Sequence, residues 1–185
     1  RLKTGGAIGQ LTAIAGNAQD DADLLSVISP AEIVINLVGI LAPSGQQTFT
    51  ALQAELPARI GRMAKEAECH QIVHVSALGA KLKSQSTYAR TKAEGERGLL
   101  RQFPDAVIMQ PSIIFGPGDN FFNRFGQMAM FSPALPLIGG GTSLMQPVYV
   151  GDVAHAVLAA LTMEEAKGKI YQLGGPQTYS FADLM

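Results

Sequence analysis

Short aliphatic segments alternate with longer helical stretches along this chain, and this alternation constrains the fold more than any other feature. The aliphatic segments have the composition of buried strands and lie at residues 10–15, 33–39, 71–76, 106–110 and 170–173. The helical stretches lie at residues 20–28, 48–67, 87–102 and 153–161. Pro57 falls inside one of them and predicts a kink there. Because parallel strands need crossover connections, the pattern predicts an α/β fold around a parallel sheet.

The composition narrows the class of protein. The chain has 185 residues, 47% hydrophobic and 16% charged, which is typical of a soluble globular domain. A net charge of -1 without a basic run argues against a nucleic-acid partner. The longest apolar stretch, residues 33–42, is about half a membrane span, so we expect no membrane-spanning segment. A single cysteine, Cys69, fits a reducing compartment, and we expect a cytoplasmic protein.

Both ends of the sequence look cut. The chain begins at Arg1 without an initiating Met or an apolar signal-peptide core, and it stops within an apparent helix. We therefore expect residues 1–185 to form a single domain fragment. Residues 116–147 are rich in Gly, Pro, Phe and Met, and we expect them to contribute to a small substrate or lid region. The phenylalanines there have helical spacing, which also fits core packing.

Loops that follow the strands of a parallel sheet share its carboxyl edge, where open α/β sheets bind ligands. Four stretches should therefore meet there: AGNAQD, NLVGIL, HVSALGA and QPSIIFGPGD. Each contains a small residue that allows close approach of a ligand to the backbone. A ligand site at this edge follows from the order of the segments.

Tyr88 and Lys92 are four residues apart in STYARTKAEGERGLL, which places them on one helix face about one turn apart. A nearby cation lowers the pKa of a tyrosine from its usual value of about 10 and makes proton transfer easier. Lys92 can also donate to the hydroxyls of a ribose. The alternative is an ordinary surface helix, on which Arg90 pairs with Glu94 and Lys92 with Glu96.

Metal and hydrolase chemistry have little support. Of the histidines, His70 and His74 bracket a strand, and only Cys69 lies at a ligand-like spacing, so we predict no metal site. HVSALG lacks the first glycine of a hydrolase nucleophile elbow. The glycine-containing GGAIGQ, residues 5–10, has no strand before it, which argues against a phosphate-binding loop.

These ordered motifs resemble those of the short-chain dehydrogenase/reductase superfamily in its extended or atypical, epimerase/dehydratase-like form. The resemblance rests on AGNAQDDADL, VINLVG, HVSALGA, YARTK, QPSIIFGPGD, QPVYVGDVAHAVLAAL and GKIYQLGGPQTYSFADL. It implies a Rossmann-type, doubly wound parallel sheet and bound NADP or NAD. The first β-α-β unit, with its Gly-rich loop, and a C-terminal part are then missing from the sequence. The residues that select NAD or NADP are missing with them.

HVSALGA, YARTKAEGE, FFNRF and QPVYVGDVA are also similar to the group of nucleotide-binding accessory subunits of respiratory complex I and their bacterial relatives. This resemblance implies a structural or assembly role, respiratory complex I subunits as partners and a location peripheral to the inner membrane. The alternatives are an active NAD(P)-dependent oxidoreductase or sugar-nucleotide epimerase/dehydratase, and a redox-sensing regulator. Neither a substrate nor an oligomeric state can be read from the residues.

The superfamily's functional residues carry over by motif. The resemblance implies catalytic roles for Tyr88, Lys92 and Ser76. It implies a cofactor-binding set of Asn17, Leu37, Val38, Gly39, Ser76, Tyr88, Lys92, Pro111 and Ser112. Two positions depart from the pattern. Asn17 stands where an Asp is usual, and Leu78 stands where the catalytic Ser or Thr is usual, which favours binding without turnover unless Ser76 replaces the missing hydroxyl.

Overall fold

A parallel four-stranded sheet forms the centre of the computed structural model, which describes residues 10–119, 121–131 and 138–184. The strands, in spatial order, are β1 (Ile33–Asn36), β2 (Gln71–Val75), β3 (Val107–Pro111) and β7 (Ile170–Leu173). Every neighbouring pair runs parallel. The predicted α/β fold with a parallel sheet is confirmed.

Residues 10–15 were expected to form a strand, and this prediction is wrong. They have no regular structure, and Leu11 and Ile14 are 49% and 66% exposed. A short aliphatic segment becomes a strand only beside a partner, because its backbone groups need a neighbouring strand. Among the described residues, β1 pairs only with β2, so no partner is available at the outer edge of β1.

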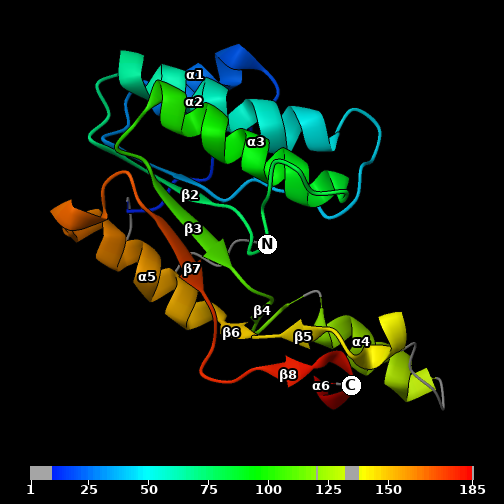
Figure 1. The fold of residues 1–185 in the computed structure, drawn as a ribbon. Helices are drawn as coiled ribbons and strands as arrows, with labels where there is room; N and C mark the ends of the chain where they lie inside the picture. The colour runs from blue at the N-terminus through cyan, green and yellow to red at the C-terminus, as the bar shows by residue number, and fades with distance from the viewer. Residues whose placement is uncertain (1–9, 120, 132–137, 185) are drawn as a thin grey trace.

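Helices cover both faces of the sheet (Figure 1). On one face lie α1 (Asp21–Ile28), α2 (Leu56–Glu66) and α3 (Thr87–Gln102), and on the other lies α5 (Val150–Thr162). α1 begins where the Asp20 carboxylate accepts hydrogen bonds from the backbone N–H groups of Ala22 and Asp23. The result is the three-layer arrangement expected of a doubly wound fold.

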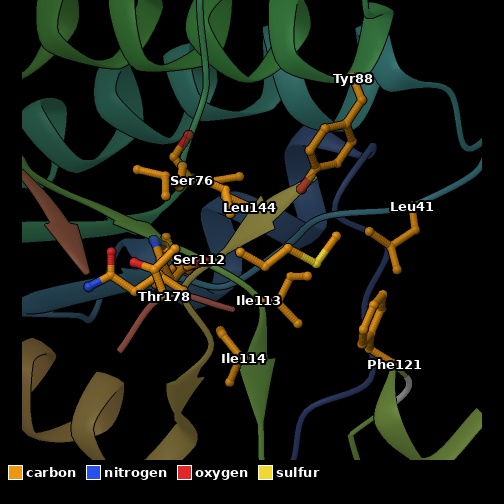
Figure 2. A pocket seen from close by; sticks show the side chains of 15 residues that line it. Leu41, Ser76, Tyr88, Ser112, Ile113, Ile114, Phe121, Leu144 and Thr178 are labelled. Atoms are coloured by element: carbon orange, nitrogen blue, oxygen red, sulfur yellow. The ribbon is translucent and has the colours of Figure 1, made fainter. Parts of the chain in front are cut away.

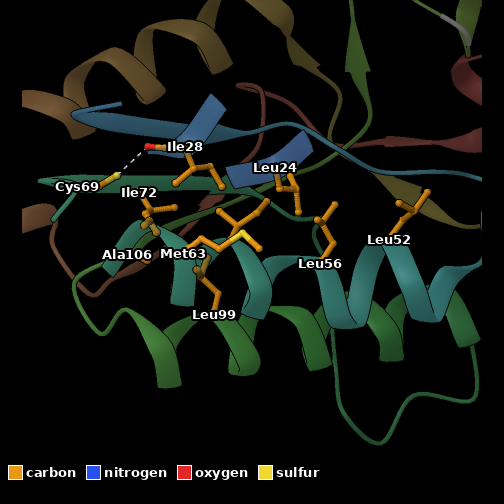
Figure 3. Packing of buried hydrophobic residues seen from close by; sticks show 11 residues of the cluster. Leu24, Ile28, Leu52, Leu56, Met63, Cys69, Ile72, Leu99 and Ala106 are labelled. Atoms are coloured by element: carbon orange, nitrogen blue, oxygen red, sulfur yellow. Dashed lines mark hydrogen bonds between the residues drawn. The ribbon is translucent and has the colours of Figure 1, made fainter. Parts of the chain in front are cut away.

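Two buried clusters correspond to the two faces. Figure 3 shows the first, between the sheet and the three-helix layer; its largest members are Leu24, Ile28, Leu52, Leu56, Ile60, Met63, Ile72 and Leu99. The second, beneath α5, contains Val73, Val107, Met109, Val157, Ala160 and Ala166. Neighbouring residues of β2, Ile72 and Val73, enter different clusters because successive strand side chains point to opposite faces.

The kink expected at Pro57 takes the form of a wider turn. A π-helical segment, η1 (Thr50–Glu55), precedes α2, and Pro57 lies in the first turn of α2. η1 runs directly into α2, since the Leu56 N–H donates to the carbonyl oxygen of Ala51, and the wider π-helical turn lies where Pro57 has no N–H to continue the helical hydrogen bonds. α3 packs closely on this junction, since a Cβ built on Gly95 would lie 2.0 Å from the carbonyl oxygen of Gln53.

A smaller region extends from the carboxyl side of the sheet (Figure 1). Its strands pair as β4 (Ile114–Phe115) with β6 (Val148–Tyr149) and β5 (Leu144–Met145) with β8 (Tyr179–Ser180). Its helices are α4 (Phe122–Phe131), η2 (Ile138–Gly141) and α6 (Phe181–Leu184), while η3 (Glu164–Ala166) follows α5.

The phenylalanines of this region take part in packing. The rings of Phe121 and Phe125 lie 6.3 and 5.6 Å from that of buried Phe181. A lid role for residues 116–147 stays a prediction, as does the assignment of residues 1–185 to one domain fragment. Positions 120 and 132–137 lie outside the described residues. In the part of the chain that is described, no helix is long and apolar enough to span a membrane.

The close approach of α3 to η1 gives a stability prediction. Gly95→Ala should lower the free energy of unfolding by roughly 2 kcal/mol or more, because the new methyl group would overlap a backbone oxygen that cannot easily move. Denaturant unfolding monitored by circular dichroism measures the change.

The matched control is Gly126→Ala in α4, where a Cβ would meet no heavy atom of the described residues within 4 Å. Alanine favours helix over glycine, so this variant should be as stable as the wild type or more so by up to about 1 kcal/mol. Equal effects of the two substitutions would contradict the close packing at Gly95.

Candidate functional site

A pocket of about 750 Å³ lies at the carboxyl edge of the sheet (Figure 2). Three of the four stretches expected to meet there supply its wall: Leu41 after β1, Ser76 to Leu78 after β2, and Pro111 to Ile114 around the end of β3. Phe121, Leu144, Met145, Gln146 and Thr178 of the smaller region complete it. The fourth stretch, AGNAQD, does not line the pocket.

Tyr88 reaches this pocket from the first turn of α3. The helix begins at Ser86, whose hydroxyl accepts the N–H of Ala89. The Tyr88 ring packs edge-on against Phe49, with centroids 5.9 Å apart, and its hydroxyl points into the pocket (Figure 2). Burial raises the pKa of Tyr88 above its ordinary value, whereas we expected Lys92 to lower it. Tyr88 is therefore a neutral phenol at neutral pH.

Lys92 is buried one turn further along α3. Its ammonium group donates to the carbonyl oxygen of Val75 over 3.4 Å, and a Cβ on Gly39 would lie 3.2 Å from Nζ. The group therefore lies between the loop after β1 and the end of β2. Burial lowers the pKa of Lys92, and the charge of Glu96 opposes that shift. The surface-helix alternative is wrong for this pair, because Lys92 and Glu96 are only 5% and 6% exposed.

Glu96 was not predicted as a site residue. It accepts a short hydrogen bond from the Ser76 hydroxyl and two from the Gln110 side chain, of 2.9 and 3.1 Å. The helical period could have indicated its burial, since Glu96 shares a face of α3 with Lys92 and Leu99. The period does not show what lies opposite that face.

Ser76 and Leu78 present different groups to the pocket. Ser76 lines it, but its hydroxyl proton is directed to Glu96. Leu78 is 43% exposed and lines the pocket with an alkyl side chain, while its N–H donates to the carbonyl oxygen of Pro111 over 2.9 Å. Neither side chain offers a free hydroxyl donor on this wall.

A buried amide–imidazole pair orders the loop after β1. Asn36 accepts the N–H of Val38 and donates to Nδ1 of His74, each over 3.0 Å. This pattern assigns the imidazole proton to Nε2, which has no hydrogen-bond partner among the described residues. Burial and the charge of Lys92 lower the pKa of His74 to about 3, so it is neutral at physiological pH. The sequence suggested a role for His74 only as a metal ligand.

The remaining predicted residues are divided in space. Pro111 and Ser112 line the pocket, and the Ser112 N–H donates to the carbonyl oxygen of Leu173 over 2.8 Å. Asn17 holds the turn before α1, where its N–H donates to Asp23 and its side-chain oxygen accepts from Gln19.

Ser76, Tyr88, Pro111 and Ser112 are thus brought together, with Lys92 and Gly39 just behind them. Leu37, Val38 and Asn17 do not line the pocket. Within the described ranges, no group of three or more His, Cys, Asp or Glu residues is placed to hold a metal ion.

The solved structure of dTDP-glucose 4,6-dehydratase from Streptomyces venezuelae, with NAD bound, is similar to this chain in fold. Its TM-score is 0.78 at 19% identity, over 91% of this chain and 60% of that one. At this level of identity the similarity shows a shared fold. It agrees with the predicted Rossmann-type architecture.

Curated relatives are more similar in sequence. NADH dehydrogenase (ubiquinone) 1 alpha subcomplex subunit 9, mitochondrial, from Mus musculus is 36% identical over all of this chain and 49% of its own length. The Arabidopsis thaliana protein of the same name is 35% identical over 99% of this chain and 46% of its own. The chain thus spans about half the length of these relatives. The sequence profile of the NAD dependent epimerase/dehydratase family matches residues 2–174, and the chain belongs to that family.

Proposed function

We propose that this chain is the dinucleotide-binding part of a protein that binds NAD(H) or NADP(H) and has a structural or assembly role in respiratory complex I. The observation that carries the proposal is the buried Lys92 ammonium beside Gly39 and the end of β2, directly behind a pocket that contains Tyr88. Among the described residues Lys92 forms no ion pair within 4 Å, and the charge of Glu96 only partly opposes the effect of burial. A buried charge is costly, and a polar ligand at this position would offset that cost.

The chemistry of the site fits a dinucleotide. Lys92 has three N–H donors, of which a ribose diol can accept two, and Tyr88 adds a hydroxyl. Gly39 lacks a side chain where one would crowd Nζ. Leu37, 69% exposed on the loop after β1, offers an apolar surface to a planar base. Pro111 and Ser112 would hold the nicotinamide end, which supplies hydride chemistry when bound.

The side chains that line the pocket also favour nucleotide binding with little catalytic turnover. Carbonyl reduction needs a hydrogen-bond donor to the developing alkoxide besides the proton donor. Tyr88 can donate a proton, but Leu78 has no hydroxyl and the Ser76 proton is directed to Glu96. The second candidate function, an active oxidoreductase or sugar-nucleotide epimerase/dehydratase, is favoured by the Tyr88 hydroxyl, which points into the pocket (Figure 2).

Complex I subunits are the proposed partners because the similar mouse and Arabidopsis proteins are named as mitochondrial NADH dehydrogenase subunits. The proposed location is peripheral to the membrane that holds the complex.

Native electrophoresis of solubilised membranes from the source organism tests this association. The whole protein should migrate with in-gel NADH dehydrogenase activity. A protein found only as a free species, with the complex intact, would contradict the assembly role.

The nucleotide proposal predicts that Lys92→Ala in the full-length protein weakens NADPH or NADH binding by roughly tenfold or more. Hydrogen bonds from a charged donor are worth about 1.5–3 kcal/mol, and each 1.4 kcal/mol is about tenfold in affinity. Quenching or enhancement of nucleotide fluorescence gives the dissociation constant.

Lys65→Ala is the control, since Lys65 is an exposed lysine of α2 and does not line the pocket. It should leave affinity unchanged, and Lys92→Met should reproduce the loss while it keeps the buried volume. Wild-type protein that binds neither nucleotide, or tight binding by Lys92→Ala, would show that the proposal is wrong.

A panel of sugar nucleotides, aldehydes and ketones should give little or no NAD(P)H oxidation with the wild-type protein. Tyr88→Phe should keep nucleotide affinity within about fivefold, because one neutral hydrogen bond is worth about 1 kcal/mol. Absorbance of the reduced nucleotide follows turnover. Robust turnover that Tyr88→Phe abolishes would favour the active enzyme instead.

A further inference from the structure

Within the described part of the chain, the side chain of Glu96 acts as the acceptor in each of its hydrogen bonds. Ser76 donates to Oε1, and the Gln110 amide nitrogen donates to both carboxylate oxygens. At its other end the Gln110 amide oxygen accepts from the side-chain nitrogen of Gln172 over 3.4 Å. All three bonds run toward the two side-chain oxygens of Glu96, which act as the acceptors of this cluster.

This arrangement leaves the Ser76 hydroxyl with one defined direction. A serine has a single proton and two lone pairs, and the proton is committed to Glu96. Ser76 also lines the pocket at the carboxyl edge. What it can present to that pocket is therefore its lone pairs.

We propose that Glu96 is a positioning residue that makes Ser76 a hydrogen-bond acceptor in the pocket, so that the ligand group meeting Ser76 is a donor such as an amide N–H or a hydroxyl. The inference rests on the proposed function only in taking this pocket as the ligand site. It also explains why Ser76 does not replace the hydroxyl that Leu78 lacks. Tyr88 then remains the phenolic donor of the pocket. The Ser76 side of the pocket accepts hydrogen bonds, and the Tyr88 side donates them.

The isosteric change Glu96→Gln should reverse this polarity. Its side chain keeps one acceptor oxygen, which Gln110 occupies, and gains an N–H donor that faces Ser76. The Ser76 proton is then released toward the pocket. Glu94→Gln is the matched control, because Glu94 lies on the same helix and does not line the pocket.

A thiol at position 76 makes the effect measurable without any nucleotide. In Ser76→Cys protein, the carboxylate of Glu96 should hold the S–H and disfavour the reactive thiolate. Adding Glu96→Gln should speed alkylation by iodoacetamide at neutral pH by about tenfold or more, which corresponds to about one unit of thiol pKa. Adding Glu94→Gln should change the alkylation rate less than about twofold, because solvent and salt screen the charge of Glu94. Peptide mass spectrometry separates position 76 from the buried native Cys69.

Equal rates with and without Glu96→Gln would overturn the proposal, as would a position 76 that reacts only after denaturation. A double-mutant cycle of Ser76→Ala and Glu96→Gln checks the coupling without a thiol. The unfolding constant of the double variant should differ at least about fivefold from the product of the single effects, and additive effects would overturn the proposal. Nucleotide affinity is measured on the same samples, so a wild-type protein that binds no nucleotide contradicts the proposed function while the alkylation rates still decide the role of Glu96.

Discussion

The buried polar face of α3 is the constraint on which the rest of the site depends. Lys92 and Glu96, one turn apart, enter the protein beneath the ends of β2 and β3. Buried charges must be hydrogen-bonded or paired. The end of β2 supplies a carbonyl oxygen to the Lys92 ammonium, and Ser76 and Gln110 supply donors to the Glu96 carboxylate. The position of the pocket wall follows from these bonds.

The sheet explains why these groups meet at one place. All four strands are parallel, so their carboxyl ends lie at one edge, and the loops after β1, β2 and β3 supply much of the pocket wall. Within the described residues, β1 lacks a strand on its outer side, and its Ile33 and Ile35 are exposed. The site therefore uses the carboxyl ends of β1, β2 and β3 together with the smaller region, and not the exposed side of β1.

Much of this arrangement could be predicted from the sequence. The aliphatic segments identified the four strands of the sheet, and the four-residue spacing placed Tyr88 and Lys92 on one face of a helix. The partners of that face could not be predicted, because a periodic pattern gives the side of a helix and not what packs against it. From the sequence, Glu96 was therefore interpreted as one member of a weak surface ion pair, and His74 as a possible metal ligand. Residues 10–15 have strand composition but no partner strand, and composition alone cannot supply one.

Hydrogen–deuterium exchange of the full-length protein, with and without saturating NADPH or NADH, tests the central claim most directly. That claim places a dinucleotide at the carboxyl edge of the sheet, against the loops at residues 37–41, 76–78 and 112–114. Bound nucleotide should slow amide exchange in these three segments together and leave α5 on the opposite face unchanged. No protection at saturation, or protection confined to other parts of the chain, would contradict the account.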